Sequence, residues 1–303
     1  MRARTIAKRF LELPVVNPIL RQLASRVPAT DTIARIPINL PEVEASIDGA
    51  RFVMTNPRDC NVARSIYWGR GRPVRKAEAT ALSIFAASSR EAEFVFDVGA
   101  NTGLFSLLAS SANPAARVHS FEIVPVVFAQ LVRNIVRNDV ARSVEPHLLG
   151  VGQPDGAVRV PTGSFGSSLP LSVSLLDRYQ TGAEIPVRSL DQLTASLGVR
   201  GSLLVKIDVE GAERTVFEHG AETFAKFKPD VVCEILHDSD VPALLEVFLR
   251  NNGMRALLIE DEGLRASAKI EPHSHYRDWF LTARSDDALD AMLGPLGLRV
   301  LGR

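Results

Sequence analysis

Acidic side chains stand at the ends of several apolar, strand-like segments of this 303-residue chain. They are Asp97, Glu122, Asp208 and Glu234, within segments 94–98, 117–122, 203–208 and 231–236. An unpaired carboxylate is costly to bury in an apolar strand, so four such placements indicate a shared purpose. In an open parallel sheet, ligands bind beyond the carboxyl ends of the strands. The pattern therefore predicts a ligand site lined by carboxylates.

The first of these segments continues into a turn with two glycines. The turn is Asp97-Val98-Gly99-Ala100-Asn101-Thr102-Gly103, and an apolar, helix-like stretch begins at Leu104. A strand, a tight loop and a helix in this order are typical of a nucleotide-type cofactor site. Glycine lets the backbone turn sharply and approach a ligand. The helix start directs free N–H groups and a partial positive charge at the loop.

The loop departs from the dinucleotide pattern GxGxxG, which requires glycine where Asn101 stands. Glu122 follows the loop by about twenty residues, a placement from which an acid accepts hydrogen bonds from ribose hydroxyls. Alternatively, it is an N-terminal charge for the helix that begins at Pro125. Carboxylates at this edge would repel a pyrophosphate and attract a cationic sulfonium. The residues therefore favour S-adenosylmethionine (SAM) over NAD.

Two further segments, Leu190-Asp191 and Lys206-Ile207-Asp208-Val209-Glu210-Gly211-Ala212-Glu213, follow the glycine turn. Together with that turn and Glu122, they resemble the FkbM family of SAM-dependent methyltransferases, over residues 45–285. The resemblance implies an α/β class I methyltransferase fold (Rossmann-like), with a seven-stranded, mostly parallel sheet, an antiparallel last strand and helices on both faces. It also implies in-line O-methylation of a hydroxyl group on a sugar, a glycolipid or a secondary metabolite.

The resemblance also implies roles for individual residues. The loop would line the methionine part of SAM, and Glu122 would bind the ribose. The full set expected to bind SAM is Asp97, Gly99, Ala100, Asn101, Thr102, Gly103, Glu122, Ile123 and Asp208.

An alcohol acceptor has a pKa far above 7, so a base or a metal ion should help to remove its proton. The candidate catalytic residues at this edge are Asp208, Glu210 and His237, with Glu234 beside them. His237 is either a general base or an exposed loop residue. Asp208 and Glu234 could share a divalent cation such as Mg²⁺. The alternative is a structural hydrogen-bonded network that includes Glu210 and Glu234.

Strand and helix patterns alternate along the chain, which predicts a mostly parallel sheet covered by helices on both faces. The expected strands are 94–98, 117–122, 144–151, 203–208, 231–236, 254–260 and 278–283, the last of them antiparallel at the sheet's edge. The expected helices are 75–90, 103–112, 125–137, 189–197, 211–226 and 240–252. Four parts follow: a basic N-terminal helix and linker (1–44), a cap-like hairpin and lead-in helix (45–92), the SAM-binding domain (93–285) and a C-terminal tail (286–303).

The composition favours neither nucleic acid nor disulfides. Lysine plus arginine and aspartate plus glutamate each total 35, so no net charge favours a nucleic-acid partner. Only Cys60 and Cys233 occur, far apart, which predicts a reducing, cytoplasmic setting without a thiolate metal site.

The N-terminal residues 1–27 are basic, with apolar residues roughly at helical spacing. One interpretation is a peripheral anchor on the inner, anionic face of a membrane. The other is a helix that packs on the domain or on a second subunit. Prolines interrupt any signal-peptide core, and no apolar run reaches the ~18–20 residues that span a bilayer.

Two other functions compete with methyl transfer. An NAD(P)-dependent oxidoreductase would need glycine at position 101, and a non-catalytic, membrane-associated SAM-binding protein would fit the basic N-terminus. The acceptor, a small molecule or a glycolipid, would be recognised by segment 67–72 or by a lid within 152–187. His119 and His147 fall inside strand patterns, where ordinary packing is expected.

Overall fold

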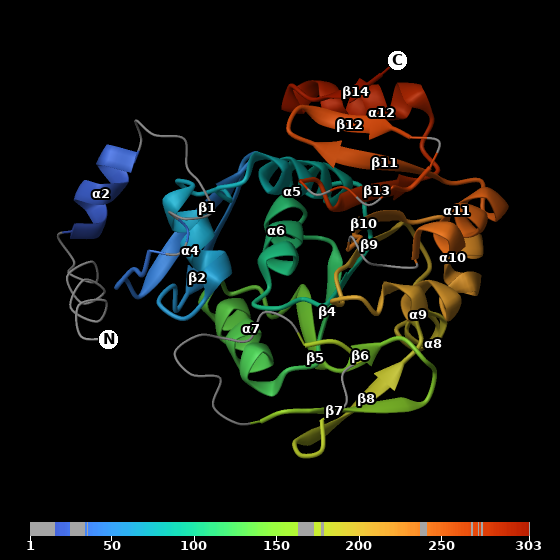
Figure 1. The fold of residues 1–303 in the computed structure, drawn as a ribbon, viewed down its shortest axis with the longest axis horizontal. Coiled ribbons are helices and arrows are strands. Elements are labelled where there is room, and N and C mark those ends of the chain that lie inside the picture. Colours follow the sequence, from blue (N-terminus) through green and yellow to red (C-terminus); the bar gives the residue numbers. More distant parts are fainter. Residues whose placement is uncertain are drawn as a thin grey trace.

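The computed structural model describes residues 16–24, 34, 36–162, 173–176, 179–236, 241–267, 269–271, 273 and 275–302. Its centre is a sheet with the strand order β14-β12-β11-β13-β10-β9-β3-β4-β5 (Figure 1). The strands are β3 (Phe94–Val98), β4 (Arg117–Glu122), β5 (Val144–Leu148), β9 (Leu203–Ile207), β10 (Asp230–Glu234), β11 (Arg255–Glu260), β12 (Gly263–Ala266), β13 (Asp278–Thr282) and β14 (Arg299–Leu301).

The five strands from β5 to β10 are parallel, and β13 is antiparallel to both of its neighbours. The predicted α/β, mostly parallel, Rossmann-like architecture is confirmed. Two details of the prediction were wrong. The antiparallel strand lies inside the sheet, between β10 and β11, because Trp279, Phe280 and Leu281 bury both of its faces. The strands β12 and β14 also extend the sheet beyond the expected seven.

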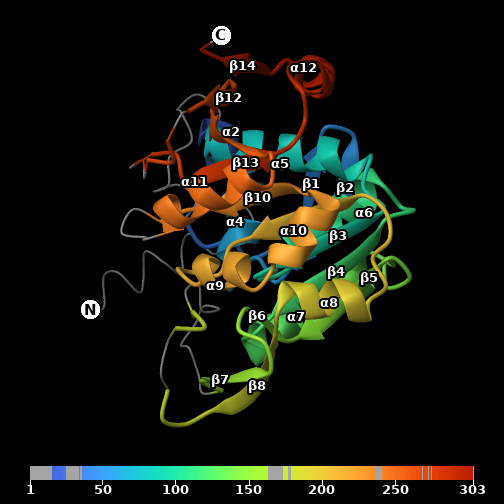
Figure 2. The same ribbon diagram turned by 90° about the vertical axis from the view of Figure 1, so that its right-hand side faces the viewer.

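Helices cover both faces of the sheet (Figure 2). One apolar cluster joins the sheet to α5 (Lys76–Ser89), α6 (Leu104–Ala112), α7 (Pro125–Arg137) and α12 (Asp286–Leu293). The other joins it to α8 (Leu190–Ser196), α9 (Glu213–Glu218), α10 (Ala221–Phe227) and α11 (Val241–Asn251). The expected single helix over 211–226 is two helices, because the chain breaks at His219 and Gly220 between α9 and α10.

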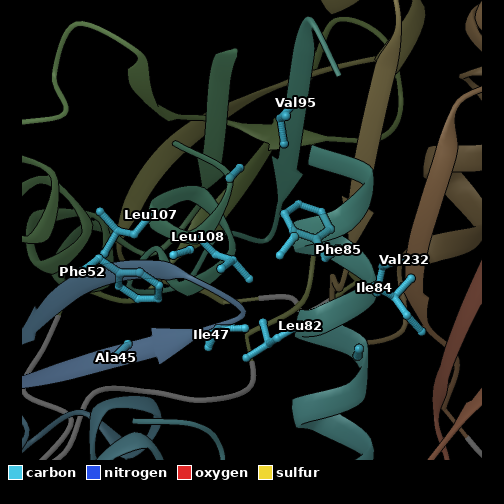
Figure 3. Packing of buried hydrophobic residues seen from close by; sticks show 14 of the residues in the cluster. Ala45, Ile47, Phe52, Leu82, Ile84, Phe85, Val95, Leu107, Leu108 and Val232 are labelled. Carbon is cyan, nitrogen blue, oxygen red and sulfur yellow. The ribbon is translucent and has the colours of Figure 1, made fainter. Parts of the chain in front are cut away.

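The N-terminal hairpin pairs β1 (Glu42–Ile47) with β2 (Ala50–Thr55) around Asp48 and Gly49. Both turn residues have positive φ, 47° and 89°, as a tight two-residue hairpin turn requires. The hairpin packs on α5 and α6, and Figure 3 shows Phe52 beside Leu107 and Leu108. The cap therefore shares one core with the sheet.

Between β5 and α8, three short strands form a second sheet in the order β6-β8-β7. They are β6 (Gly150–Val151), β7 (Gly156–Val160) and β8 (Ala183–Arg188). Within the candidate lid segment 152–187, residues 163–172 and 177–178 lie outside the described residues.

The described part of the basic N-terminus is α2 (Val16–Ala24), which contacts the cap. Asn17 donates to the carbonyl of Pro37 (3.3 Å), and the guanidinium of Arg21 lies 4.6 Å from the ring centre of Tyr67, on α4 (Asn61–Trp68). These contacts agree with a helix packed on the domain. Across the described residues, no helix is both long and apolar enough to cross a bilayer.

Candidate functional site

The loop between β3 and α6 lies directly against two neighbouring strands. The N–H groups of Gly99 and Ala100 donate to the carbonyl of Phe121 on β4 (3.0 and 2.9 Å). Gly99 has a φ of +77°, and a Cβ there would lie 1.8 Å from the carbonyl oxygen of Asp208, just beyond β9. Only glycine fits this close approach.

Asn101 occupies the left-handed region, with a φ of 49°. Its Oδ1 accepts the N–H of Thr102 (2.8 Å), and such a local bond lets asparagine tolerate this conformation. The side chains of Ala100 and Thr102 are buried, so these two residues can offer a ligand only backbone groups. Gly103, with a φ of +91°, precedes the first turn of α6.

Glu122 is 7% exposed and binds the loop. One carboxylate oxygen accepts the N–H of Asn101 (2.9 Å), and the other accepts that of Val124 (2.8 Å), where α7 begins. Burial raises the pKa of Glu122, against the effect of these donors. Each carboxylate oxygen has a second acceptor site, which leaves room for ribose hydroxyls. The two roles expected from the sequence are therefore compatible.

Asp97 lies beneath the loop and is fully buried. Its Oδ2 accepts the backbone N–H (3.0 Å) and the hydroxyl (2.5 Å) of Ser106 on α6. Burial raises its pKa, and the charge of Lys206 opposes this effect. This buried carboxylate holds α6 in place, and its expected contact with the methionine part of SAM stays a prediction.

Lys206 of β9 connects the loop to the strand end. Its Nζ donates to the carbonyl of Gly99 (2.8 Å) and lies 3.2 Å from Asp208 Oδ2 and 3.9 Å from Asp97 Oδ1. Burial lowers the pKa of Lys206, but the charges of Asp208 and Asp97 outweigh it, so the pKa is raised. The ammonium group therefore stays charged and fixes the loop to β9.

Three carboxylates meet at this edge: Asp208, Glu234 and Asp278. Glu234 and Asp278 are direct partners in the antiparallel register of β10 and β13. Burial, the charge of Asp208 and a hydrogen bond to it raise the pKa of Glu234 to about 9. Burial, followed by the charge of Asp208, raises the pKa of Asp278 to about 7. Near neutral pH, Glu234 is therefore protonated and can donate a hydrogen bond to Asp208.

These carboxylates line a cavity of about 240 Å³ between the sheet and the cap. Its apolar wall includes Ile66, Leu82, Leu104 and Phe105, and its polar wall includes Arg75, Glu78, His275, Arg277, Asp208, Glu234 and Asp278. Apolar walls with a few convergent polar groups are typical of a small-molecule site. Ile66 and Pro73, on either side of segment 67–72, line this cavity. Tyr67 and Trp68 themselves are buried in the cap.

The remaining predicted residues lie around this centre. Glu210 has a φ of 54° in the turn after β9, and its charge helps to raise the pKa of Glu234. Ile123 packs against the small cluster beside β7 and β8. His237 lies outside the described residues, so its role as a base stays a prediction.

The predicted cation between Asp208 and Glu234 competes with two features of the site. Lys206 already supplies a positive charge to Asp208, and the raised pKa of Glu234 keeps its carboxyl group protonated near neutral pH. Over the part of the chain that the structure describes, these carboxylates belong to no group of three metal-ligating side chains. The site therefore fits the alternative, a hydrogen-bonded network.

Sequence reasoning assigned no role to Lys206 or Asp278. Lysine in an otherwise apolar strand needs buried partners, which was an available indication. Asp278 begins an antiparallel strand, and the start of such a strand lies at the same edge as the ends of the parallel strands. Its neighbours, however, follow from strand order, which the sequence does not show.

The chain is similar to several known methyltransferases. The profile of the methyltransferase FkbM domain matches residues 97–256. The 31-O-demethyl-FK506 methyltransferase FkbM of Streptomyces tacrolimicus is 33% identical over 210 residues, covering 60% of this chain and 79% of that protein. Methyltransferase sdnD of Sordaria araneosa is 25% identical over 228 residues, covering 58% and 87%. Among solved structures, methyltransferase FkbM of Methylobacillus flagellatus KT aligns with a TM-score of 0.43 and 17% identity, over 63% of this chain and 44% of that one.

The fold and the cofactor loop define a class I, SAM-dependent methyltransferase. With the profile match over residues 97–256, the chain belongs to the FkbM methyltransferase family.

Proposed function

We propose that this methyltransferase transfers the methyl group of SAM to a hydroxyl group of a small molecule, such as a sugar, a glycolipid or a secondary metabolite. The observation that carries the proposal is the cavity beside the cofactor loop, with Asp208 in its wall. The relative from Streptomyces tacrolimicus, which is named for an O-demethyl substrate, supports oxygen as the acceptor atom.

We assign the SAM site to the surface over β3 and β4. Glu122 would accept hydrogen bonds from the ribose, and the backbone of the loop 99–103 would contact the methionine part. The acidic edge suits the positive sulfonium, since opposite charges attract. Lys206 and Asp97 act from below, by holding the loop and α6 in position.

SAM supplies an activated methyl group, so much of the rate can come from alignment of the acceptor oxygen. The apolar wall around Leu104 and Phe105 excludes water and orients the acceptor. Asp208 would accept the hydroxyl proton of the acceptor, and SAM, held by Glu122 and the loop 99–103, would supply the methyl group. The protonated Glu234 would donate a hydrogen bond to Asp208 and keep Asp208 ionised until this step.

Calorimetry with SAM, S-adenosylhomocysteine (SAH) and NADH tests the cofactor. We expect binding of SAM and SAH and no binding of NADH. A folded chain that binds neither SAM nor SAH would contradict the proposal, and NADH binding would favour the oxidoreductase.

Radiolabelled SAM and a panel of matched hydroxyl and amine acceptors test the acceptor atom. Asp208→Asn should lower turnover by about 10²–10⁴-fold, the usual contribution of a general base. The control Asp287→Asn changes an exposed acid on α12 and should leave turnover unchanged. Label transfer to amines alone would refute O-methylation.

A further inference from the structure

A second group of ligating side chains lies outside the site described above. His119 is on β4, and Glu145 and His147 are on β5, the neighbouring edge strand. His119 is the direct register partner of Glu145, and His147 is the partner of Phe121. Side chains two residues apart on a strand share a face, so all three residues project from the same face of this strand pair.

Their spacing matches the first coordination sphere of a metal ion. His119 Nδ1 lies 3.1 Å from His147 Nε2 and 3.4 Å from Glu145 Oε2. One ligand atom from each of the three side chains lies within 4.8 Å of the others. In tetrahedral zinc, bonds of about 2.0–2.1 Å separate neighbouring ligand atoms by about 3.3 Å.

Aromatic neighbours hold the two imidazole rings in place. Phe121 stacks on His147 with ring centres 4.9 Å apart, and Phe96 meets His119 edge-on at 5.5 Å. Burial lowers the pKa of His119 to about 4 and also lowers that of His147. Both rings are therefore neutral near pH 7, the form that binds metal.

Two charged side chains near His119 and His147 have opposite effects on the binding of a cation. The carboxylate of Glu145 favours a cation, whereas the nearby guanidinium of Arg117 opposes one. Glu145 is within ligand distance, and Arg117 interacts with the ring of Phe94. The charges around the three side chains are therefore compatible with a bound divalent ion.

We propose that His119, Glu145 and His147 form a binding site for a divalent transition-metal ion, with Zn²⁺ as the best fit and a fourth position for water. Two histidines and a glutamate are a known zinc ligand set. The ion would join the edge strand β5 to β4, three residues before Glu122. It would thus stabilise the strand that carries the proposed ribose ligand.

Titration calorimetry with ZnCl₂, on full-length protein free of any polyhistidine tag, tests the site. We expect one ion per chain, a visible d–d spectrum typical of tetrahedral Co²⁺ on cobalt substitution, and a higher melting temperature with zinc. Loss of an outer-shell partner weakens metal binding by about 10–100-fold, so His147→Gln, which removes a ligand, should weaken it at least tenfold.

His219→Gln, a half-buried histidine at the end of α9, is the matched control and should bind zinc like the wild type. If His147→Gln does not fold, Glu145→Gln takes its place, because this side chain is 64% exposed. Absence of stoichiometric zinc binding, or equal affinity in the ligand variant and the control, would show that the two rings share only a hydrogen bond. Neither outcome depends on SAM binding, which SAH calorimetry on the same samples reports separately.

Discussion

Glu122 and Lys206, at the sheet's edge beside the proposed SAM site, each bind two partners in the protein. Glu122 supports the loop through Asn101 and the start of α7 through Val124, and each of its oxygens keeps one further acceptor site. Lys206 supports the loop from below and stabilises Asp208. These bonds give each buried polar group a partner, because a buried donor or acceptor without one lowers the stability of the fold.

Glu122→Gln tests the ribose contact. The amide keeps the shape but replaces one acceptor oxygen with a donor, so SAH affinity should fall by about 1–3 kcal/mol in calorimetry. Glu184→Gln, which changes an exposed side chain on β8, should leave the affinity unchanged. Wild-type affinity in a folded Glu122→Gln chain would refute the assignment.

Gly99→Ala tests the close approach between the loop and β9. The added Cβ would collide with the carbonyl of Asp208, so denaturant unfolding should show a loss of stability and calorimetry a loss of SAH binding. Gly198→Ala is the matched control, because Gly198 also has positive φ but nothing within 4 Å of its Cβ position. In the control, the free energy of unfolding should fall by about 1–2 kcal/mol, because only backbone strain is added. Equal losses would mean that the contact with Asp208 is unimportant.

Glu234→Gln tests the protonation of Glu234 through the pH dependence of stability. The pKa of Glu234 rises on folding from an ordinary 4.5 to about 9, so the folded chain holds this proton more tightly than the unfolded chain. The resulting stabilisation is complete below about pH 4.5 and is lost as the pH rises toward 9. The variant lacks this loss, so its free energy of unfolding relative to the wild type should increase with pH, by at most about 1.4 kcal/mol per unit.

The measurement is urea unfolding between pH 5 and 9, with Glu218→Gln on α9 as an exposed control. If the free energy of unfolding has the same pH dependence in the wild type and in Glu234→Gln, Glu234 does not hold the proton.

At the scale of elements, α7 connects the hairpin to the cofactor loop. Asn134 is fully buried; its Oδ1 accepts the N–H of Thr55 on β2 (2.8 Å), and its Nδ2 donates to the carbonyl of Thr102 (2.8 Å). The cap is thereby tied to the loop that we assign to SAM.

Asn134→Ala should lower the free energy of unfolding by at least about 2 kcal/mol, because it leaves buried groups on β2 and in the loop unsatisfied. It should also weaken SAH binding. Asn138→Ala, one turn further on, removes bonds to Val53 in a half-buried position and should spare SAH affinity. An equal effect of the two substitutions on SAH binding would argue against the connection.

At the scale of the whole molecule, the C-terminal residues belong to the core. Leu289 of α12 is fully buried against the cluster that includes α5, and β14 pairs with β12. The expectation of a tail over 286–303 therefore underestimated this region.

Leu289→Ala should cost about 2–5 kcal/mol in urea unfolding, the usual range for a buried leucine. The same substitution at Leu176, which is 62% exposed, should change stability by less than about 0.5 kcal/mol. A small effect at Leu289 would support the original expectation of a tail.

The amino-acid sequence is enough to predict the strands with terminal carboxylates, the glycine turn and the Asp48-Gly49 hairpin, because local spacing and turn chemistry specify them. It also indicates the family, which the comparisons confirmed. The three-dimensional structure was needed to show that β13 lies inside the sheet, that Asp97 is buried, and that Lys206 and Asp278 join Asp208. It alone brought His119 to Glu145 and His147. These outcomes depend on strand order and register, which arise from packing between segments far apart in the chain.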